Sequence, residues 1–506
     1  MSDQPSQSST LGASVKWSML ANLLQEAATG VITFVLAALL TPRDFGLVST
    51  AGVYLIFAEI LAGLGLQIAI IQTPTFNRNI FSSVFWTLTG LSGLMSAGIF
   101  LGAGWVAGIN RMPELEPVMR ALALLMPLGC ASALYQAVHQ RDKNFKALAI
   151  RSGVATTLGG VVGVGMAVSH YGVWALVGQR VTTDVISLFT LATQTRWHPR
   201  LHLRLSEVKP LLPFSSKVLM GQIGVGVQGQ MDALLLALFF GPTAVGLYRL
   251  ADRLVELALR LVTRSIQNVA LTHFAALQGD PKALKTTFLR CIRISACVTI
   301  PIMIGTAVCA SPILRSLGSQ WIDGSPALAI LCAMGAAKAL TSFTGPLLQA
   351  VSRPGLASLN VWGIGVFSAL GFWVAKELSS AMTTSEQVTI VAACRTTIFL
   401  GIYLPANLVL AVIYAKVSWL ELGHALKSSL LASLLPVLIL EGVQRLDFLQ
   451  EIHPRLELSL LAALGLGSWI VSLSYFDPVL LDRIRSTAQS IRARVFQRAQ
   501  PRLRSD

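Results

Sequence analysis

Apolar stretches of about 20 residues recur through this sequence from Trp17 to Phe476, each long enough to cross a hydrocarbon layer about 30 Å thick. Only 12% of the residues are charged, against about 25% in a soluble domain. Runs of this length lack the alternating pattern of membrane barrel strands, so their backbone groups must be satisfied within helices. The sequence therefore predicts an all-α membrane protein.

Pro, Gly and charged residues separate the apolar stretches and divide the chain into fourteen predicted transmembrane helices. The polar N-terminal stretch MSDQPSQSSTLGASV has neither the basic region nor the cleavage site of a signal peptide, so we expect the first helix to remain in the mature chain. The predicted helices span 16–40, 46–71, 80–108, 117–138, 147–169, 171–192, 213–240, 244–275, 286–310, 326–350, 354–375, 387–415, 424–442 and 456–476.

The connections between these helices differ in charge according to the side of the membrane on which they would lie. With a cytoplasmic N-terminus, the outer side holds mixed pairs such as Arg43 with Asp44 and Lys376 with Glu377. The inner side holds an excess of basic residues, which gather in cytoplasmic loops. We therefore predict that both termini are cytoplasmic. The bilayer accounts for the formal net charge of +15, so we expect no nucleic-acid partner.

Two pairs of segments indicate an internal duplication. Residues 113–138 align without gaps with 326–351, and 39–48 align with 239–248, which matches Pro42 with Pro242 and Gly46 with Gly246. Internal repeats are typical of transporters, whose substrate site lies between the repeats. Chance similarity between apolar helices is the alternative, and the identities in the loops argue against it.

The duplication predicts two pseudo-symmetric six-helix lobes around a central cavity, followed by two C-terminal helices. The final tail would either lie on anionic headgroups or be solvated. The expected parts are a polar cytoplasmic tail (1–15), a first lobe (16–192), a basic cytoplasmic linker (193–212), a second lobe (213–415), helices 13 and 14 (416–476) and a basic cytoplasmic tail (477–506).

Polar residues in the first and seventh predicted helices share one face of each helix. Asn22 and Glu26 are one helical turn apart, and so are Gln222, Gly226 and Gln230 in succession. The offset of the repeat places Asn22 on Gln222. The two helices would line one cavity, or these groups would hydrogen-bond to neighbouring helices.

Charged groups inside other predicted helices are costly and mark functional or paired positions. Two of them also have simpler explanations, because Arg180 and Asp184 are spaced for a local ion pair and Arg151 could extend to a helix end. We assign substrate binding to Arg249, Arg253, Arg395, Arg151, Arg180, Asn22, Gln222 and Gln230, and ion coupling to Glu26, Glu59 and Asp232.

The eighth predicted helix is the most charged. Arg249, Arg253, Arg260 and Arg264 form one stripe along it, which a lipid-facing helix could not carry. The helix must therefore face water or protein. Because guanidinium groups bind phosphate bidentately, a basic stripe beside a polar cavity suits a phosphate-bearing or acidic substrate.

Several chemical signatures are missing from the sequence. It contains no phosphate-binding loop of the GxxxxGK[ST] type, no HExxH and no GxSxG. The outer loops are too short to carry an enzyme site. The six cysteines lie in apolar segments without a CxxC pair, which is typical of buried thiols rather than of disulfides or metal ligands. We expect neither an enzyme nor a cofactor or metal.

Five segments resemble landmarks of the bacterial polysaccharide flippases, within the multidrug/oligosaccharidyl-lipid/polysaccharide exporter superfamily. The resemblance covers roughly residues 11–415 and is specific as a set. The segments are LAALLTPRDFGLVSTAGVYLIFAEILAGLGLQIAIIQ (36–72), RDKNFKALAI (141–150), YGVWALVGQR (171–180) followed by RWHPRL (196–201), and GLYRLADRL (246–254).

This resemblance implies a transporter of the bacterial inner membrane that flips undecaprenyl-pyrophosphate-linked oligosaccharide to the periplasmic leaflet by alternating access, for exopolysaccharide or lipopolysaccharide synthesis. It implies membrane lipids and polysaccharide polymerase or export proteins as partners. It carries over no residue role. Two alternatives stay open. One is a cation-coupled drug antiporter, with Glu26 as its proton or sodium site, and the other is a non-transporting scaffold of a polysaccharide assembly complex.

Overall fold

The computed structural model describes residues 25–73, 77–195, 197–277, 279–379, 382–445 and 454–476. Every regular element in these ranges is helical. The helices are Gln25–Leu39, α2 (Pro42–Gly63), α3 (Leu66–Gln72), α4 (Arg78–Ile109), α5 (Leu115–Ala123), α6 (Met126–Arg141), α7 (Phe145–Val168), α8 (Val173–Gln194), α9 (Leu205–Val208), α10 (Leu212–Phe240), α11 (Pro242–Ala276), α12 (Pro281–Val308), α13 (Ala310–Leu317), α14 (Ser325–Thr341), α15 (Thr344–Ala350), α16 (Pro354–Ser379), α17 (Thr384–Ile398), α18 (Leu404–Ala415), α19 (Trp419–Gln444) and α21 (Pro454–Phe476). Short 3-10 turns at Lys209–Leu211 and Ser319–Gly324 and a π turn at Phe399–Tyr403 complete them.

The prediction of an all-helical membrane protein is confirmed. Nine helices in the described ranges are long and apolar enough to cross a membrane, or ten if α5 and α6, bent by 42° at their junction, form one span. Each of the fourteen predicted segments coincides, over its described part, with one helix or with consecutive helices. The count of fourteen spans itself stays a prediction. The predicted tails 1–15 and 477–506, and Asn22, lie outside the described residues.

Helix starts follow local sequence signals. Thr41 accepts a hydrogen bond from the backbone of Asp44 while the Asp44 carboxylate accepts from the Thr41 backbone, and Pro42 occupies the first turn of α2. The same reciprocal cap opens α17 at Thr383 and α19 at Ser418. These caps satisfy backbone donors that a helix cannot satisfy internally.

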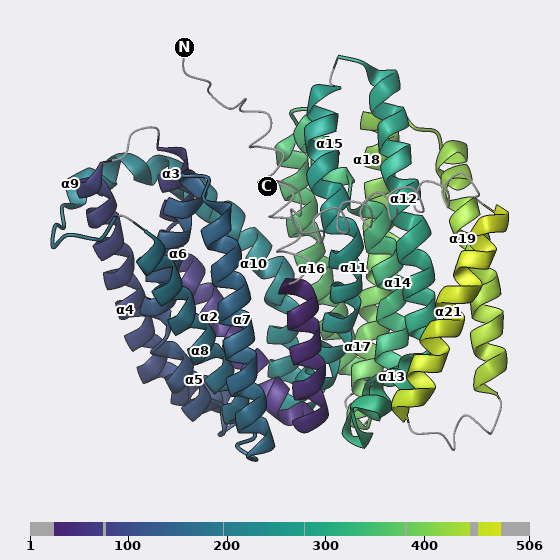
Figure 1. The fold of residues 1–506 in the computed structure, drawn as a ribbon, viewed down its shortest axis with the longest axis horizontal. Coiled ribbons are helices and arrows are strands. Elements are labelled where there is room, and N and C mark those ends of the chain that lie inside the picture. The colour runs from purple at the N-terminus through teal and green to yellow at the C-terminus, as the bar shows by residue number, and fades with distance from the viewer. Residues whose placement is uncertain are drawn as a thin grey trace, which may run out of the picture. The chain divides into compact units, whose positions relative to one another are not determined.

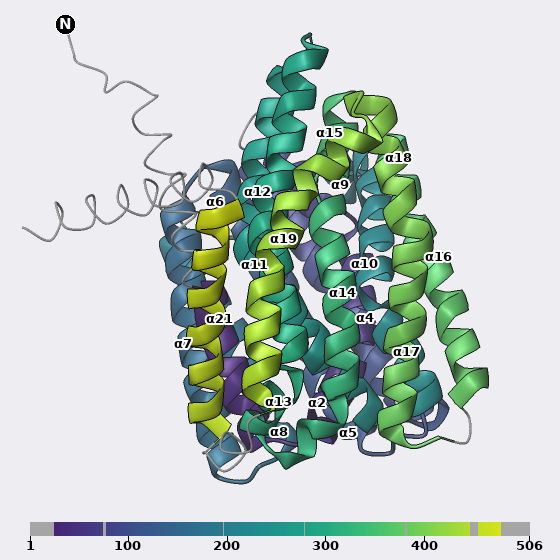
Figure 2. The same ribbon diagram turned by 90° about the vertical axis from the view of Figure 1, so that its right-hand side faces the viewer.

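The chain forms two compact units. The first comprises the described residues up to Leu257 together with Leu317–Leu328 and Pro354–Phe399. Within it, α7 packs along α8, and α10 packs along α16 (Figure 1). The second unit comprises Ala258–Ser316, Ala329–Arg353 and the described residues from Leu400 onward, and there α12, α19 and α21 lie side by side (Figure 2). The predicted lobe boundaries stay a prediction.

Two glycines matched by the sequence repeat make reciprocal contacts inside the first unit. A Cβ atom on Gly46 of α2 would lie 1.7 Å from the carbonyl oxygen of Pro242, which opens α11. A Cβ atom on Gly246 of α11 would lie 1.8 Å from the carbonyl oxygen of Pro42, which opens α2. The second helices of the two predicted halves therefore cross backbone to backbone at equivalent residues, which supports the duplication.

Candidate functional site

Four polar side chains from three helices of the first unit form what we call the buried charge cluster: Asp232, Tyr248, Asp252 and Arg395. Arg395 of α17 forms an ion pair with Asp232 of α10 and donates a hydrogen bond to the Tyr248 hydroxyl of α11. Its Nη1 atom lies 3.9 Å from Oδ1 of Asp252. The Arg395 side chain is 11% exposed and that of Asp232 is 5% exposed. The cluster therefore joins α10, α11 and α17 through charges shielded from solvent.

Other predicted residues lie on the same helices. Arg249 of α11 donates a hydrogen bond to the Gln230 side chain of α10. The predicted basic stripe lies on one continuous helix, and Arg253 is exposed on it while Arg249 is half-buried. Gln222 of α10 is also half-buried. Arginine–amide contacts of this kind leave further guanidinium N–H groups for other partners, because an arginine has five donors.

A second group, the half-exposed charge cluster, consists of Glu59, Arg180 and Asp184 in the first half of the chain. Arg180 of α8 donates a hydrogen bond from Nε to the Asp184 carboxylate at 2.7 Å, one turn further along the same helix. Its Nη2 atom lies 3.6 Å from Oε1 of Glu59 on α2. The local pair of Arg180 with Asp184 is therefore present as its spacing predicts, and Glu59 joins it from another helix.

Arg180 lies in the middle of α8 rather than at one of its ends. Its side chain is nevertheless 52% exposed. The large exposed apolar side chains of α8 are Trp174, Val185 and Phe189. At 3.6 residues per turn these three share one face, and Arg180 lies away from it. A charged group on a membrane helix avoids acyl chains and faces protein or water. Arg180 therefore lies on a side of α8 distinct from its apolar side.

The remaining predicted residues have separate places. Arg151 of α7 donates hydrogen bonds to the side chains of Gln136 at 2.8 Å and Ser152 at 3.2 Å, so it is held by neighbouring protein groups. Glu26 lies half-buried on the helix Gln25–Leu39. The structure thus brings Arg395 together with Asp232, Arg249 with Gln230, and Arg180 with Glu59.

Sequence reasoning did not identify Tyr248 or Gln136 as partners. Tyr248 lies one turn before Asp252 in the segment GLYRLADRL, so helical spacing could have placed both on one face. Gln136 contacts Arg151 across two helices. No spacing in the sequence reports a contact of that kind, because it depends on how α6 and α7 pack.

The chain is similar to known proteins over most of its length. The family model described as "Polysaccharide biosynthesis protein" matches residues 35–326. The succinoglycan biosynthesis transport protein ExoT of Rhizobium meliloti is 26% identical over 323 residues, which cover 64% of this chain and 65% of ExoT. The chain therefore aligns with slightly less than two thirds of ExoT. The lipopolysaccharide biosynthesis protein WzxC of Escherichia coli is 24% identical over 67% of this chain and 69% of WzxC.

Solved structures share the fold. The lipid II flippase MurJ in an inward closed conformation superposes with a TM-score of 0.70 at 11% identity, covering 93% of this chain and 99% of MurJ. An inward-facing multidrug transporter of the MATE family and the MOP superfamily superposes with a TM-score of 0.58 at 13% identity, covering 79% and 96%. At these identities the similarity establishes the fold alone.

Proposed function

The chain belongs to the family of polysaccharide biosynthesis proteins, and on that premise we propose that it flips a lipid-linked oligosaccharide, carried on undecaprenyl pyrophosphate, to the periplasmic leaflet by alternating access. The relatives ExoT and WzxC are named for succinoglycan transport and lipopolysaccharide synthesis, and the fold is shared with a lipid II flippase. Those names favour a transporter over an enzyme. The glycan is an intermediate of exopolysaccharide or lipopolysaccharide synthesis.

The half-exposed Arg180 is the observation that supports this function most directly. A pyrophosphate carries charge that the membrane interior cannot solvate, so a protein that moves it must offer cationic donors away from lipid. Arg180 offers such a donor group on the side of α8 away from its exposed apolar side chains, which in our proposal faces the aqueous transport path. Guanidinium N–H groups match phosphate oxygens in pairs, which gives both charge and geometry.

The two acidic neighbours of Arg180 would act differently when phosphate binds. Asp184 makes the shorter contact, at 2.7 Å, and keeps the guanidinium oriented. Glu59 makes the longer contact, at 3.6 Å, and is the partner that a phosphate oxygen would replace. Once the phosphate has displaced it from Arg180, the Glu59 carboxylate lies next to an apolar helix. Binding of a proton or a cation to this carboxylate is then favourable. We therefore assign ion coupling to Glu59 before Glu26.

We assign Arg395 and Asp232 to the framework of the transporter. Each neutralises the other inside the buried charge cluster, so Arg395 is not the first group that a phosphate would meet. Arg249 and Arg253 on α11 remain assigned to substrate contact, because they lie on the stripe that the sequence predicts and Arg253 is exposed. We place the protein in the bacterial inner membrane with both termini cytoplasmic, where a polysaccharide polymerase would receive the flipped product.

A labelling assay tests this function. Lipid-linked oligosaccharide is labelled with a membrane-impermeant reagent from the periplasmic side, in a strain that lacks this protein. We expect the precursor to accumulate unlabelled, and labelling to return with the wild-type protein. The variant Arg180→Gln should not restore labelling although it reaches normal levels in the membrane. Arg120→Gln serves as the matched control, because Arg120 forms an exposed pair with Glu116 on its own helix.

Other outcomes would support the alternatives. Normal labelling in the deletion strain together with lost resistance to cationic dyes would point to a drug antiporter. Normal labelling by Arg180→Gln and by a variant in which Glu59 and Asp184 are also neutralised would point to a scaffold that needs no charged transport path.

A further inference from the structure

The segment between α8 and α10 is fixed to the first turns of α4 by its own backbone. The Trp86 side chain donates a hydrogen bond to the carbonyl oxygen of Arg200 at 2.7 Å, and the Arg200 backbone N–H donates to Ser82 Oγ at 3.1 Å. The Arg204 backbone N–H donates to Ser83 Oγ at 3.1 Å. At the start of the segment, Trp197 is buried among aromatic rings of the unit's core. This linker is therefore a positioned element.

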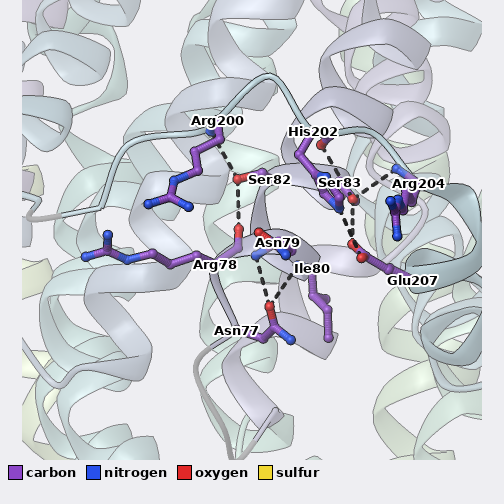
Figure 3. Close-up of polar contacts among 10 residues, drawn as sticks. All are labelled: Asn77, Arg78, Asn79, Ile80, Ser82, Ser83, Arg200, His202, Arg204 and Glu207. Carbon is purple, nitrogen blue, oxygen red and sulfur yellow. Dashed lines mark hydrogen bonds and ion pairs between the residues drawn. The ribbon is translucent and has the colours of Figure 1, made fainter.

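Polar contacts of Glu207 fix the far end of the linker. His202 Nε2 lies 3.0 Å from the Glu207 carboxylate, and Ser83 Oγ donates to the same carboxylate at 2.8 Å (Figure 3). Glu207 is thus engaged with protein groups. The acidic charge nearest to the linker's arginines is directed into this contact and away from the exposed surface.

Leucines alternate with these polar residues and project away from the contacts that fix the linker. Leu201 is 94% exposed, Leu203 is 57% exposed and Leu205 is 66% exposed. Single exposed apolar residues are normal on a protein surface, whereas three at alternate positions in one short segment form an apolar edge. An edge of this kind needs an apolar environment to cover it.

Basic groups border this edge. Arg200 and Arg204 are exposed, and the contacts that fix the linker use their backbone atoms rather than their guanidinium groups. In Figure 3 the guanidinium groups of Arg200 and Arg78 extend to the same side. Arg78 is exposed and is the first residue of α4, a helix apolar and long enough to span the membrane. In a membrane crossed by α4, the linker would lie at the depth where this span meets the headgroups.

We propose that the linker is a binding site for anionic phospholipid, with Leu201 and Leu203 in the boundary between headgroups and acyl chains and with Arg78 and Arg200 on lipid phosphates. Leucine side chains beside arginines form the combination that binds the interface of an anionic membrane. Charge complementarity favours anionic lipid over a protein partner, because each basic residue near an anionic membrane surface adds to the affinity of the linker for that surface. The site does not depend on the identity of the transported substrate.

The full-length protein with Leu201→Cys, labelled by a polarity-sensitive fluorophore, tests this site in nanodiscs of phosphatidylcholine with increasing phosphatidylglycerol. We expect the emission to shift to shorter wavelength and acrylamide quenching to fall as phosphatidylglycerol rises. Arg200→Gln should weaken this response about fivefold in apparent affinity, and Arg78→Gln should add a similar factor. Neither change removes a contact that fixes the linker, because those contacts use the Arg200 backbone and the Arg78 carbonyl oxygen.

Two controls separate the site from general membrane proximity. A label at Lys146→Cys, exposed on the first turn of α7 at the same end of the unit, should show no dependence on phosphatidylglycerol. Unmodified protein gives the background, because Cys130, Cys297, Cys309 and Cys332 are buried and Cys291 and Cys394 are partly covered. A label at Leu201→Cys that stays fully quenchable at every lipid composition overturns the proposal. If the label is equally protected from acrylamide quenching in pure phosphatidylcholine, the assignment to anionic lipid is wrong. If it is protected from quenching only when a purified polymerase is added, the apolar edge binds a protein.

Discussion

Arg180 and Arg395 each contact carboxylates, yet the side chain of Arg180 is 52% exposed and that of Arg395 is 11% exposed. Each lies in the sixth predicted helix of its half, and their separation, 395 − 180 = 215, is close to the repeat offset of 326 − 113 = 213. Each contacts a carboxylate on the second helix of its half, at 3.6 Å for Glu59 and 3.9 Å for Asp252. The added carboxylate of Asp232 and the hydroxyl of Tyr248 enclose Arg395. We therefore propose recognition as the role of Arg180 and architecture as the role of Arg395.

Replacing Arg395 should reduce the amount of folded protein. Arg395→Leu breaks the buried ion pair of Arg395 with Asp232, and removing one member of a buried pair costs about 3–5 kcal/mol. The double variant Asp232→Leu with Arg395→Leu removes both charges and should recover part of the loss. The yield of monodisperse protein in size-exclusion chromatography measures this. A double variant as poor as the single one would contradict the account.

Replacing Arg180 should affect transport more than folding. Arg180→Gln takes the cation away from Glu59, which is partly exposed, and from Asp184, which is 15% exposed, so we expect a smaller loss of stability than for the buried pair of Arg395 with Asp232. We expect export of polymer to fall by about tenfold or more, the loss expected when one charge-assisted contact of about 1.5–3 kcal/mol is removed. Arg180→Lys keeps the positive charge but lacks the planar guanidinium group. We therefore expect its polymer export to lie between that of the wild-type protein and that of Arg180→Gln. If Arg180→Gln exports polymer normally at normal protein levels, the phosphate assignment is wrong.

The crossing of α2 and α11 should tolerate no side chain at Gly46. A methyl group there would meet the Pro242 carbonyl, so the helices must move apart. We expect Gly46→Ala to lower the apparent melting temperature in detergent, with a cost of about 1–3 kcal/mol. Gly52→Ala lies on the same helix with nothing within 4 Å of its Cβ position and is the matched control. Equal melting temperatures for the two variants would refute a close crossing.

The packing of α7 on α8 depends on glycine in the same way. A Cβ atom on Gly163 would lie 2.9 Å from Cβ of Gln179, whereas one on Gly165 would meet open space. Small residues let membrane helices approach closely. Gly163→Val should therefore destabilise the protein and separate Arg180 from its present surroundings, while Gly165→Val should not. Thermal unfolding and the export assay, run on both variants, check this pair.

Much of the architecture follows from the sequence. The length of the apolar segments is enough to predict membrane helices. In lipid, a closed barrel is the only other element that satisfies the hydrogen bonds of the backbone. The helix starts at Thr41, Thr383 and Ser418 carry the capping pattern that the structure shows. Internal identities such as Gly46 with Gly246 predict the duplication, and the close crossing, which restricts both positions to the same residue type, supports it.

The roles of the intramembrane charges could not be predicted in this way. Spacing along one helix finds Arg180 with Asp184, whereas the pairs of Arg395 with Asp232 and of Arg151 with Gln136 join residues on different helices. The effect of a charge depends on the groups around it and on its access to water. The sequence by itself determined which residues are charged and that the apolar segments form helices long enough to cross a membrane, and it predicts a repeat of the two halves. Only the tertiary structure decided which arginine is neutralised and which stays available, because burial and pairing arise when separate helices pack.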